Sequence, residues 1–143
     1  LYSGVGFDAL SDSKLLEIKL TLGINDAGME QAAKIKGLKS LTVVHSQVSE
    51  AAVKFFEGHP NLESFSIAEM GNVSQAAMAS IAKMPKVEHV GFHEAFVTYE
   101  SGLKHLLPMK GRLKTLDLSM SLINAADLQL VRADHPDAKI TTI

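Results

Sequence analysis

The chain repeats one apolar pattern five times, and a repeat of this length leaves few architectures open. In each copy, the first apolar residue is followed by a second three places later and a third two places after that. The five triplets are Leu15, Ile18, Leu20; Leu38, Leu41, Val43; Leu62, Phe65, Ile67; Val87, Val90, Phe92; and Leu113, Leu116, Leu118. Their first residues are 23, 24, 25 and 26 residues apart. The alternation at the end of each triplet predicts a short strand with one buried face.

A helix signal follows each triplet at nearly constant distance. A β-branched residue is followed directly by a residue whose side chain can cap a helix, namely Asn25, Ser49, Ser74, Thr98 or Asn124. An apolar pair at i, i+3 then places two side chains on one helix face, as in Met29 and Ala32, Val53 and Phe56, Met78 and Ile81, Leu103 and Leu106, and Leu128 and Val131. Each unit ends on a helix-stopping residue: Gly37, Gly58, Pro85, Gly111 or Pro136.

The predicted unit is therefore strand, turn, helix, turn, and its single apolar face can be buried only against a neighbouring unit. This predicts an α/β solenoid with a parallel sheet on the concave side and helices on the convex side. We expect one domain over 1–143, with full repeats at 14–37, 38–61, 62–86, 87–112 and 113–139. A partial repeat at 1–13 precedes them, and a closing strand at 140–143 follows. Because 1–13 is similar to the back half of a repeat and no initiator Met is present, we expect a fragment of a longer protein, with the missing part upstream.

These residues resemble the leucine-rich-repeat family, whose strand carries the pattern L-x-x-L-x-L, and the match spans Lys14 to Ile143. The repeats are most similar to helix-containing bacterial variants, including those of planctomycetes, in which a capping residue and an acidic residue precede Gly-Leu. Residues 24–29 come closest to that pattern, and residues 98–103 come next. The resemblance implies a short right-handed horseshoe and a role in protein binding. The Asn or Cys that the family places eight residues after the first Leu is replaced here by Gly23, Ser46, Met70, Ala95 and Ser121.

Composition and motifs narrow the class of activity. Fourteen Lys and Arg against sixteen Asp and Glu leave a net charge of -2, without the basic excess that nucleic-acid binding needs. No apolar run approaches the ~18 residues of a membrane-spanning helix, so we expect a soluble chain without membrane insertion. The sequence contains no cysteine, no nucleophile elbow and no phosphate-binding loop, and His93-Glu94 has Val97 where a zinc-binding helix needs a second His. We therefore predict a protein that is not an enzyme and has no cofactor. The compartment is left open.

The predicted recognition surface is the concave face, formed by residues two, four and six places after each triplet start. The candidate partner-binding residues are Glu17, Lys19, Thr21, Thr42, Val44, Ser64, Ser66, His89, His93, Thr115 and Asp117. The middle of this face is small and polar and has none of the Trp, Tyr and Arg residues that dominate tight interfaces. The pattern therefore favours a protein or peptide that binds weakly.

Two alternatives stay open. Bacterial repeats of this type are often attached to catalytic or cytochrome domains, so the chain is alternatively an accessory positioning domain of a larger enzyme or cytochrome-type protein. A second alternative is a weak metal or small-ligand site at the strand ends, where His45, Glu69 and Glu94 share the seventh position after the triplet start and His93 is adjacent. Solvated charges at the rim of a solenoid explain such residues better than a metal site does, and no metal is assigned. The N-terminal repeat end, around Phe7, Leu10 and Leu15, is expected to promote self-association.

Overall fold

The computed structural model of the protein describes residues 3–4, 6–72 and 75–143. Within this part, the strands pair in chain order into one all-parallel sheet. The strands are β1 (Glu17–Thr21), β2 (Ser40–Val44), β3 (Ser64–Asn72), β4 (His89–Phe96), β5 (Thr115–Asp117) and β6 (Lys139–Thr141). The 3₁₀ helices are η1 (Phe7–Leu10), η2 (Glu50–Phe56) and η3 (Leu103–Met109), and the α-helices are α1 (Asp26–Ala32), α2 (Gln75–Ala82) and α3 (Ala125–Asp134). The predicted α/β class and the parallel sheet are confirmed.

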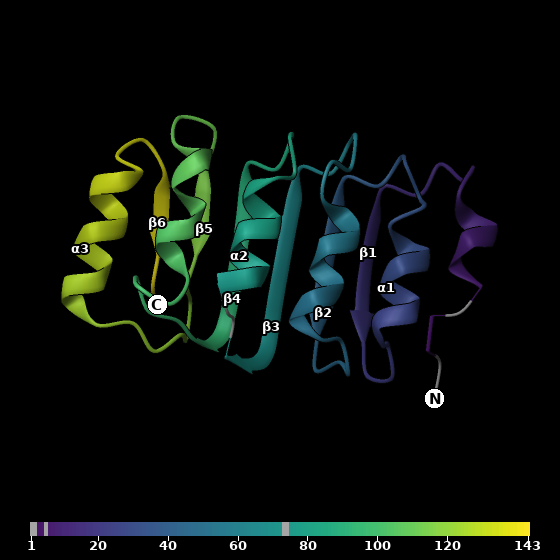
Figure 1. The fold of residues 1–143 in the computed structure, drawn as a ribbon, viewed down its shortest axis with the longest axis horizontal. Coiled ribbons are helices and arrows are strands. Elements are labelled where there is room, and N and C mark those ends of the chain that lie inside the picture. Colours follow the sequence, from purple (N-terminus) through teal and green to yellow (C-terminus); the bar gives the residue numbers. More distant parts are fainter. Residues whose placement is uncertain (1–2, 5, 73–74) are drawn as a thin grey trace.

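The helical segments form a layer against one face of the sheet, and the chain runs from one end of the array to the other (Figure 1). A crossover of this kind is needed because parallel strands must all start at the same edge. In β2, buried Leu41 and Val43 alternate with half-buried Ser40, Thr42 and Val44. We call the face that carries the second set, opposite the helical layer, the open face.

The strand register aligns equivalent residues of successive repeats although the repeats differ in length. Leu41 pairs with Phe65, Phe65 with Val90, and Val90 with Leu116, and each of these side chains is at most 2% exposed. The additional length of the third repeat is taken up after Ala68, where the pairing of β3 with β4 shifts. The extra residues lie in the turns, so the rows of buried apolar side chains stay continuous across the strands.

The core consists of the predicted triplets and helix pairs, and its completeness depends on position in the array. The helix pairs of the first four repeats are buried, whereas in α3 only Val131 is buried and Leu128 is half-buried. At the other end, Leu15, Ile18 and Phe7 of η1 are half-buried, and each packs against the buried core. Terminal repeats have a neighbour on one side only, which is why their apolar residues stay partly exposed.

The predicted helix caps divide into two groups. Asn25 and Asn124 cap α1 and α3 as expected, since their side chains accept hydrogen bonds from the N–H groups of Gly28 and Asp127. Ser49 does not cap η2; its hydroxyl donates instead to the Asp26 carboxylate of the preceding repeat. The Ser74 cap and the preceding Val73 lie outside the described residues.

Thr98 also caps a turn rather than a helix. Its Oγ1 accepts from the Ser101 N–H at 3.1 Å, and η3 begins only at Leu103. A short polar side chain that satisfies a nearby N–H group favours turns as well as helix starts, so the same signal marks both.

The closing strand differs from the expected range of 140–143. β6 spans Lys139–Thr141, and Ile140 pairs with Leu116, the second member of the preceding triplet. The last repeat therefore starts at Asp137, at the place where the other repeats have an apolar residue. Asp137 is exposed, so the acidic side chain stays in contact with water.

Candidate functional site

The register brings the predicted partner-binding residues together in rows on the open face. One row is Glu17, Ser40, Ser64, His89 and Thr115, and the next is Lys19, Thr42, Ser66, Gly91 and Asp117. A third row is Thr21, Val44, Ala68 and His93. Glu17, Lys19 and Thr21 on β1 are exposed, and the residues farther along these rows are half-buried except for buried Gly91. All eleven candidates thus lie on one continuous polar surface.

One end of this surface holds two histidines against the next strand. The His89 Nδ1 atom lies 2.9 Å from Oγ1 of Thr115, and the His93 Nε2 atom lies 3.8 Å from Oδ2 of Asp117. Partial burial acts to raise the pKa of Asp117, but hydrogen bonds from the Ser119 hydroxyl and N–H, together with the nearby His93, outweigh it and lower the pKa. Asp117 is therefore an ionised carboxylate at neutral pH.

Gly91 contributes to this surface in a way that the sequence pattern does not reveal. A Cβ atom at this position would lie 2.7 Å from Oγ of Ser66 and 3.0 Å from Nε2 of His93. The His93 side chain thus folds back over the glycine toward Ser66. A larger residue here would force the Ser66 and His93 side chains to move, so the glycine allows both to lie above the strand.

The proposed metal ligands do not gather into one cluster. His45 Nε2 pairs with Oε2 of Glu69, and His93 pairs with Asp117, whereas Glu94 is exposed and has no ion pair with any described residue. In residues 3–4, 6–72 and 75–143, no group of three or more His, Asp and Glu side chains is arranged to hold a metal ion.

A backbone turn accounts for the shared position of these residues. His45, Glu69 and Glu94 have positive φ angles of 45°, 56° and 49°, and Met120 at the equivalent place has 59°. Positive φ is uncommon outside glycine and marks a left-handed turn. The seventh position is thus a residue at which the backbone bends locally, and in β3 and β4 the pairing resumes beyond it, with Gly71 opposite Ala95 and Asn72 opposite Phe96.

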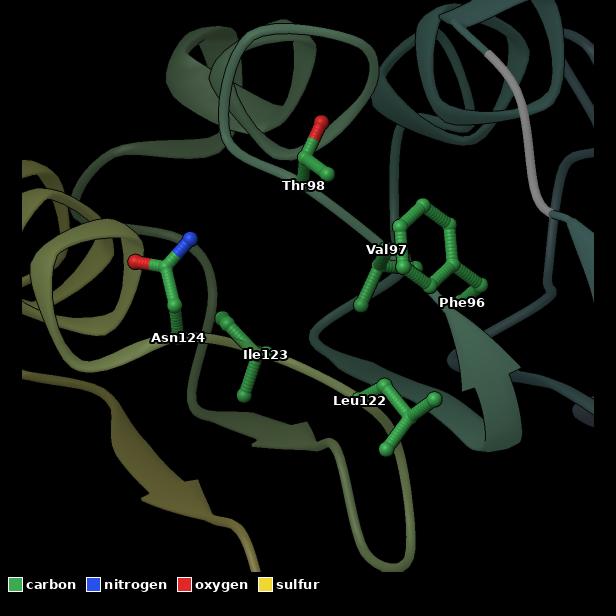
Figure 2. A pocket seen from close by; sticks show the side chains of 6 residues that line it. All are labelled: Phe96, Val97, Thr98, Leu122, Ile123 and Asn124. Carbon is green, nitrogen blue, oxygen red and sulfur yellow. The ribbon is translucent and has the colours of Figure 1, made fainter.

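A surface missed by the sequence reasoning lies next to these turns. Phe96 and Leu122 pair across a parallel bridge and are 53% and 72% exposed. They line a hollow of about 310 Å³ together with Val97, Thr98, Ile123 and Asn124 (Figure 2). The sequence did carry a signal for this surface. A bulky apolar residue directly precedes the β-branched residue in the fourth and fifth repeats, whereas the second repeat has polar Gln47 at this place.

Ser121 holds these two loops together. Its hydroxyl donates to the Phe92 carbonyl and accepts from the Ala95 N–H at 3.2 Å, and the Leu122 N–H donates to the Ala95 carbonyl at 3.1 Å. Ser121 lies eight residues after the first apolar residue of its triplet. A hydroxyl therefore links the last two turns there.

The comparisons with known proteins give no assignment. No protein-family model matches the chain, and a search of curated proteins finds no significant match. Among the described residues, no helix has the length and apolar character needed to cross a membrane.

Proposed function

We propose that the protein is a non-enzymatic recognition module of the leucine-rich-repeat type, curved into a short right-handed horseshoe, which binds a protein or peptide on its open face. The observation that carries this proposal is the register, because it aligns small polar residues of neighbouring strands into continuous rows. Small side chains in the middle of a sheet leave room for a partner's backbone and offer hydroxyl groups for hydrogen bonding.

Charged residues at the two ends of the rows support a partner that binds in one orientation. Glu17 and Lys19 stand at the β1 end, and Asp117 with His93 stands near the β5 end. With strands about 4.8 Å apart, these ends are roughly 20 Å apart, which an extended segment of about six residues spans. Charges placed at both ends would fix the orientation of such a segment more than its affinity.

The test is affinity capture from an extract of the source cells. The open-face variant carries Glu17→Ala, Lys19→Ala, His89→Ala and His93→Ala. Its matched control carries four alanine substitutions of exposed residues on the helical layer: Glu30, Lys34, Gln129 and Arg132. We expect a partner that wild type and control retain and the open-face variant loses.

Two results would contradict the proposal, provided that all three proteins show the same thermal unfolding. Capture of the same proteins by all three forms would place recognition elsewhere. Capture of none would favour the accessory positioning domain of a larger bacterial enzyme or cytochrome-type protein.

A further inference from the structure

A second surface lies beyond the open face, at the carboxyl ends of β4 and β5. Phe96, Met120 and Leu122 are 53%, 71% and 72% exposed, and we call this group the apolar rim. Two hollows share Phe96 and Leu122. The first has a volume of about 310 Å³, and the second has a volume of about 390 Å³ and is lined by Glu94, Ala95 and Met120 as well. A contiguous set of bulky apolar side chains in water is typical of an interaction site.

The backbone beneath the apolar rim is held in place. Ser121 bridges the two loops, and the Leu122 N–H donates to the Ala95 carbonyl. Val97 next to Phe96 is 1% exposed and anchors its loop in the core, and Ile123 next to Leu122 also packs against the core. Phe96 ends β4 and Leu122 follows β5, the two residues pair in a parallel bridge, and both side chains line the hollow (Figure 2). The rim therefore exists before any partner binds, and binding does not have to order it.

The charges around the rim indicate what it binds. Neither hollow is lined by a Lys or Arg, whereas Glu94 lines the second and forms no ion pair with a described residue. Beyond Thr98 and Asn124, Asp127 adds a carboxylate, which accepts the Tyr99 N–H at 3.0 Å. The connecting segments 22–25, 45–49, 97–102 and 118–124 contain no Lys or Arg.

The helical layer provides an internal contrast. A hollow of about 400 Å³ between α2 and η3 also exposes a leucine, Leu107, but Lys83, Lys104 and His105 line it. Of these hollows among the described residues, one of the two at the rim is lined by a carboxylate without an ion pair to a described residue, whereas the one on the helical layer is lined by cationic side chains.

We propose that the apolar rim docks a cationic amphipathic segment of a partner protein. A bulky apolar side chain of that segment occupies the hollow between Phe96 and Leu122, and its Lys or Arg residues lie against Glu94 and Asp127. Charge complementarity of this kind favours fast association and selects against acidic partners. The proposal does not depend on recognition at the open face, since the two surfaces share no residue.

The probe is a fluorescent peptide of about 14 residues with Leu at helical i, i+3, i+4, i+7 spacing and Lys elsewhere. A second peptide has Glu in place of every Lys. Binding is measured by fluorescence anisotropy. The rim variant is Phe96→Ser with Leu122→Ser, and the matched control is Phe55→Ser with Leu107→Ser, whose side chains are each 45% exposed on the helical layer.

We expect the lysine peptide to bind wild type and control equally, and to bind the rim variant about tenfold more weakly or worse. A separate Glu94→Lys variant leaves the apolar surface intact. It should weaken binding severalfold at about 50 mM salt and less at about 500 mM, because salt screens exposed charges. The four-alanine open-face variant should bind the probe as wild type does, which separates this proposal from the proposed function.

Three results with the peptides would overturn the proposal. These are equal weakening in the rim and control variants, equal binding of the glutamate peptide, and failure of wild type to bind the lysine peptide. Self-association of wild type in light scattering that the rim variant loses would also overturn it, because the occupant would then be a second copy of the chain.

Discussion

Interior and terminal repeats share one sequence pattern but differ in burial. At the second position of the triplet, Leu41, Phe65 and Val90 of the interior repeats are 0 to 2% exposed, whereas Ile18 of the first repeat is half-buried. Among the helix pairs the difference appears in the fifth repeat, where Leu128 is half-buried, whereas Met29 and Ala32 of the first repeat are as buried as Phe56 because η1 contacts α1. In a stacked array a residue is stabilised by the repeats on both sides. Position in the array, rather than residue type, thus decides what a side chain contributes.

The largest expected difference between the two regions concerns the core. Phe65→Ala should lower the free energy of unfolding by about 3 to 5 kcal/mol, because it leaves a cavity between two repeats and removes the ring contact with Phe56. Ile18→Ala should lower it by only about 1 to 2 kcal/mol, since Ile18 is already half-buried and partly in contact with water. Urea unfolding of both variants measures this contrast, and equal losses would contradict it.

Two buried histidines, one in an interior repeat and one near the C-terminal end, differ in their hydrogen bonds. His59 and His135 are each 3% exposed and each precede a proline. In the interior repeat, His59 Nδ1 accepts from the Asn61 and Leu62 N–H groups, and its Nε2 lies 3.0 Å from the Ile35 carbonyl oxygen. In the last repeat, neither ring nitrogen of His135 has a hydrogen-bond partner among the described residues.

Replacing these histidines should therefore have opposite consequences. His59→Ala should cost about 2 to 3 kcal/mol because it leaves buried backbone groups unsatisfied. His135→Leu should be neutral or stabilising by up to about 1 kcal/mol, because an apolar side chain of similar size replaces an unpaired polar one. Thermal and urea unfolding of the two single variants measure both effects. A cost at His135 as large as that at His59 would contradict the difference in pairing.

Both histidines also make stability depend on pH, with a smaller effect. Burial lowers the pKa of His59 and His135 below the ordinary value of 6.5, so both are neutral in the folded chain. The unfolded chain takes up these protons first as the pH falls, and stability therefore declines below about pH 6.5 until the lowered pKa values are reached. The slope is at most about 1.4 kcal/mol per pH unit for each histidine.

Unfolding measured from pH 7.5 to 5 in wild type and in the variant His59→Ala with His135→Leu separates this contribution. The double variant should be flatter over that range. Carboxylates with a lowered pKa, such as Asp117 and Glu57, act in the same direction only at lower pH. An identical pH profile in both proteins would show that the histidines do not titrate on unfolding.

The periodic apolar pattern was sufficient to predict the sheet, its register and most of the core. Burial repeats with the unit, so the triplets locate it even where turns differ in length. The pattern placed the start of the last repeat too late, at Ile140. The repeat starts at Asp137, and an acidic residue at this position does not match an apolar pattern. It also assigned caps to Ser49 and Thr98, whose hydroxyls bond to a neighbouring carboxylate and to a turn.

The candidate site was predictable in its placement but not in its detail. Alternation along each strand identified the open face, yet the closeness of His93 to Ser66 above Gly91 depends on side-chain direction across two strands. The apolar rim was missed because Phe96 and Leu122 lie where the strands end and the turns begin. The alternation of buried and exposed residues along a strand does not predict exposure there. The shared position of His45, Glu69 and Glu94 left a weak metal site open as an alternative, whereas the structure relates this position to left-handed backbone.

We have proposed that the open face recognises a partner. A substitution that adds bulk to this face without removing a contact is the most stringent test. Thr42 is half-buried in the middle of the open face, between Lys19 and Ser66 in the register, and Trp is favoured in strands. The measurement is the amount of partner captured by Thr42→Trp and by Gln129→Trp, whose site is exposed on α3. We expect Thr42→Trp to lose the partner and Gln129→Trp to retain it, with both proteins folded. Equal retention by both would contradict it.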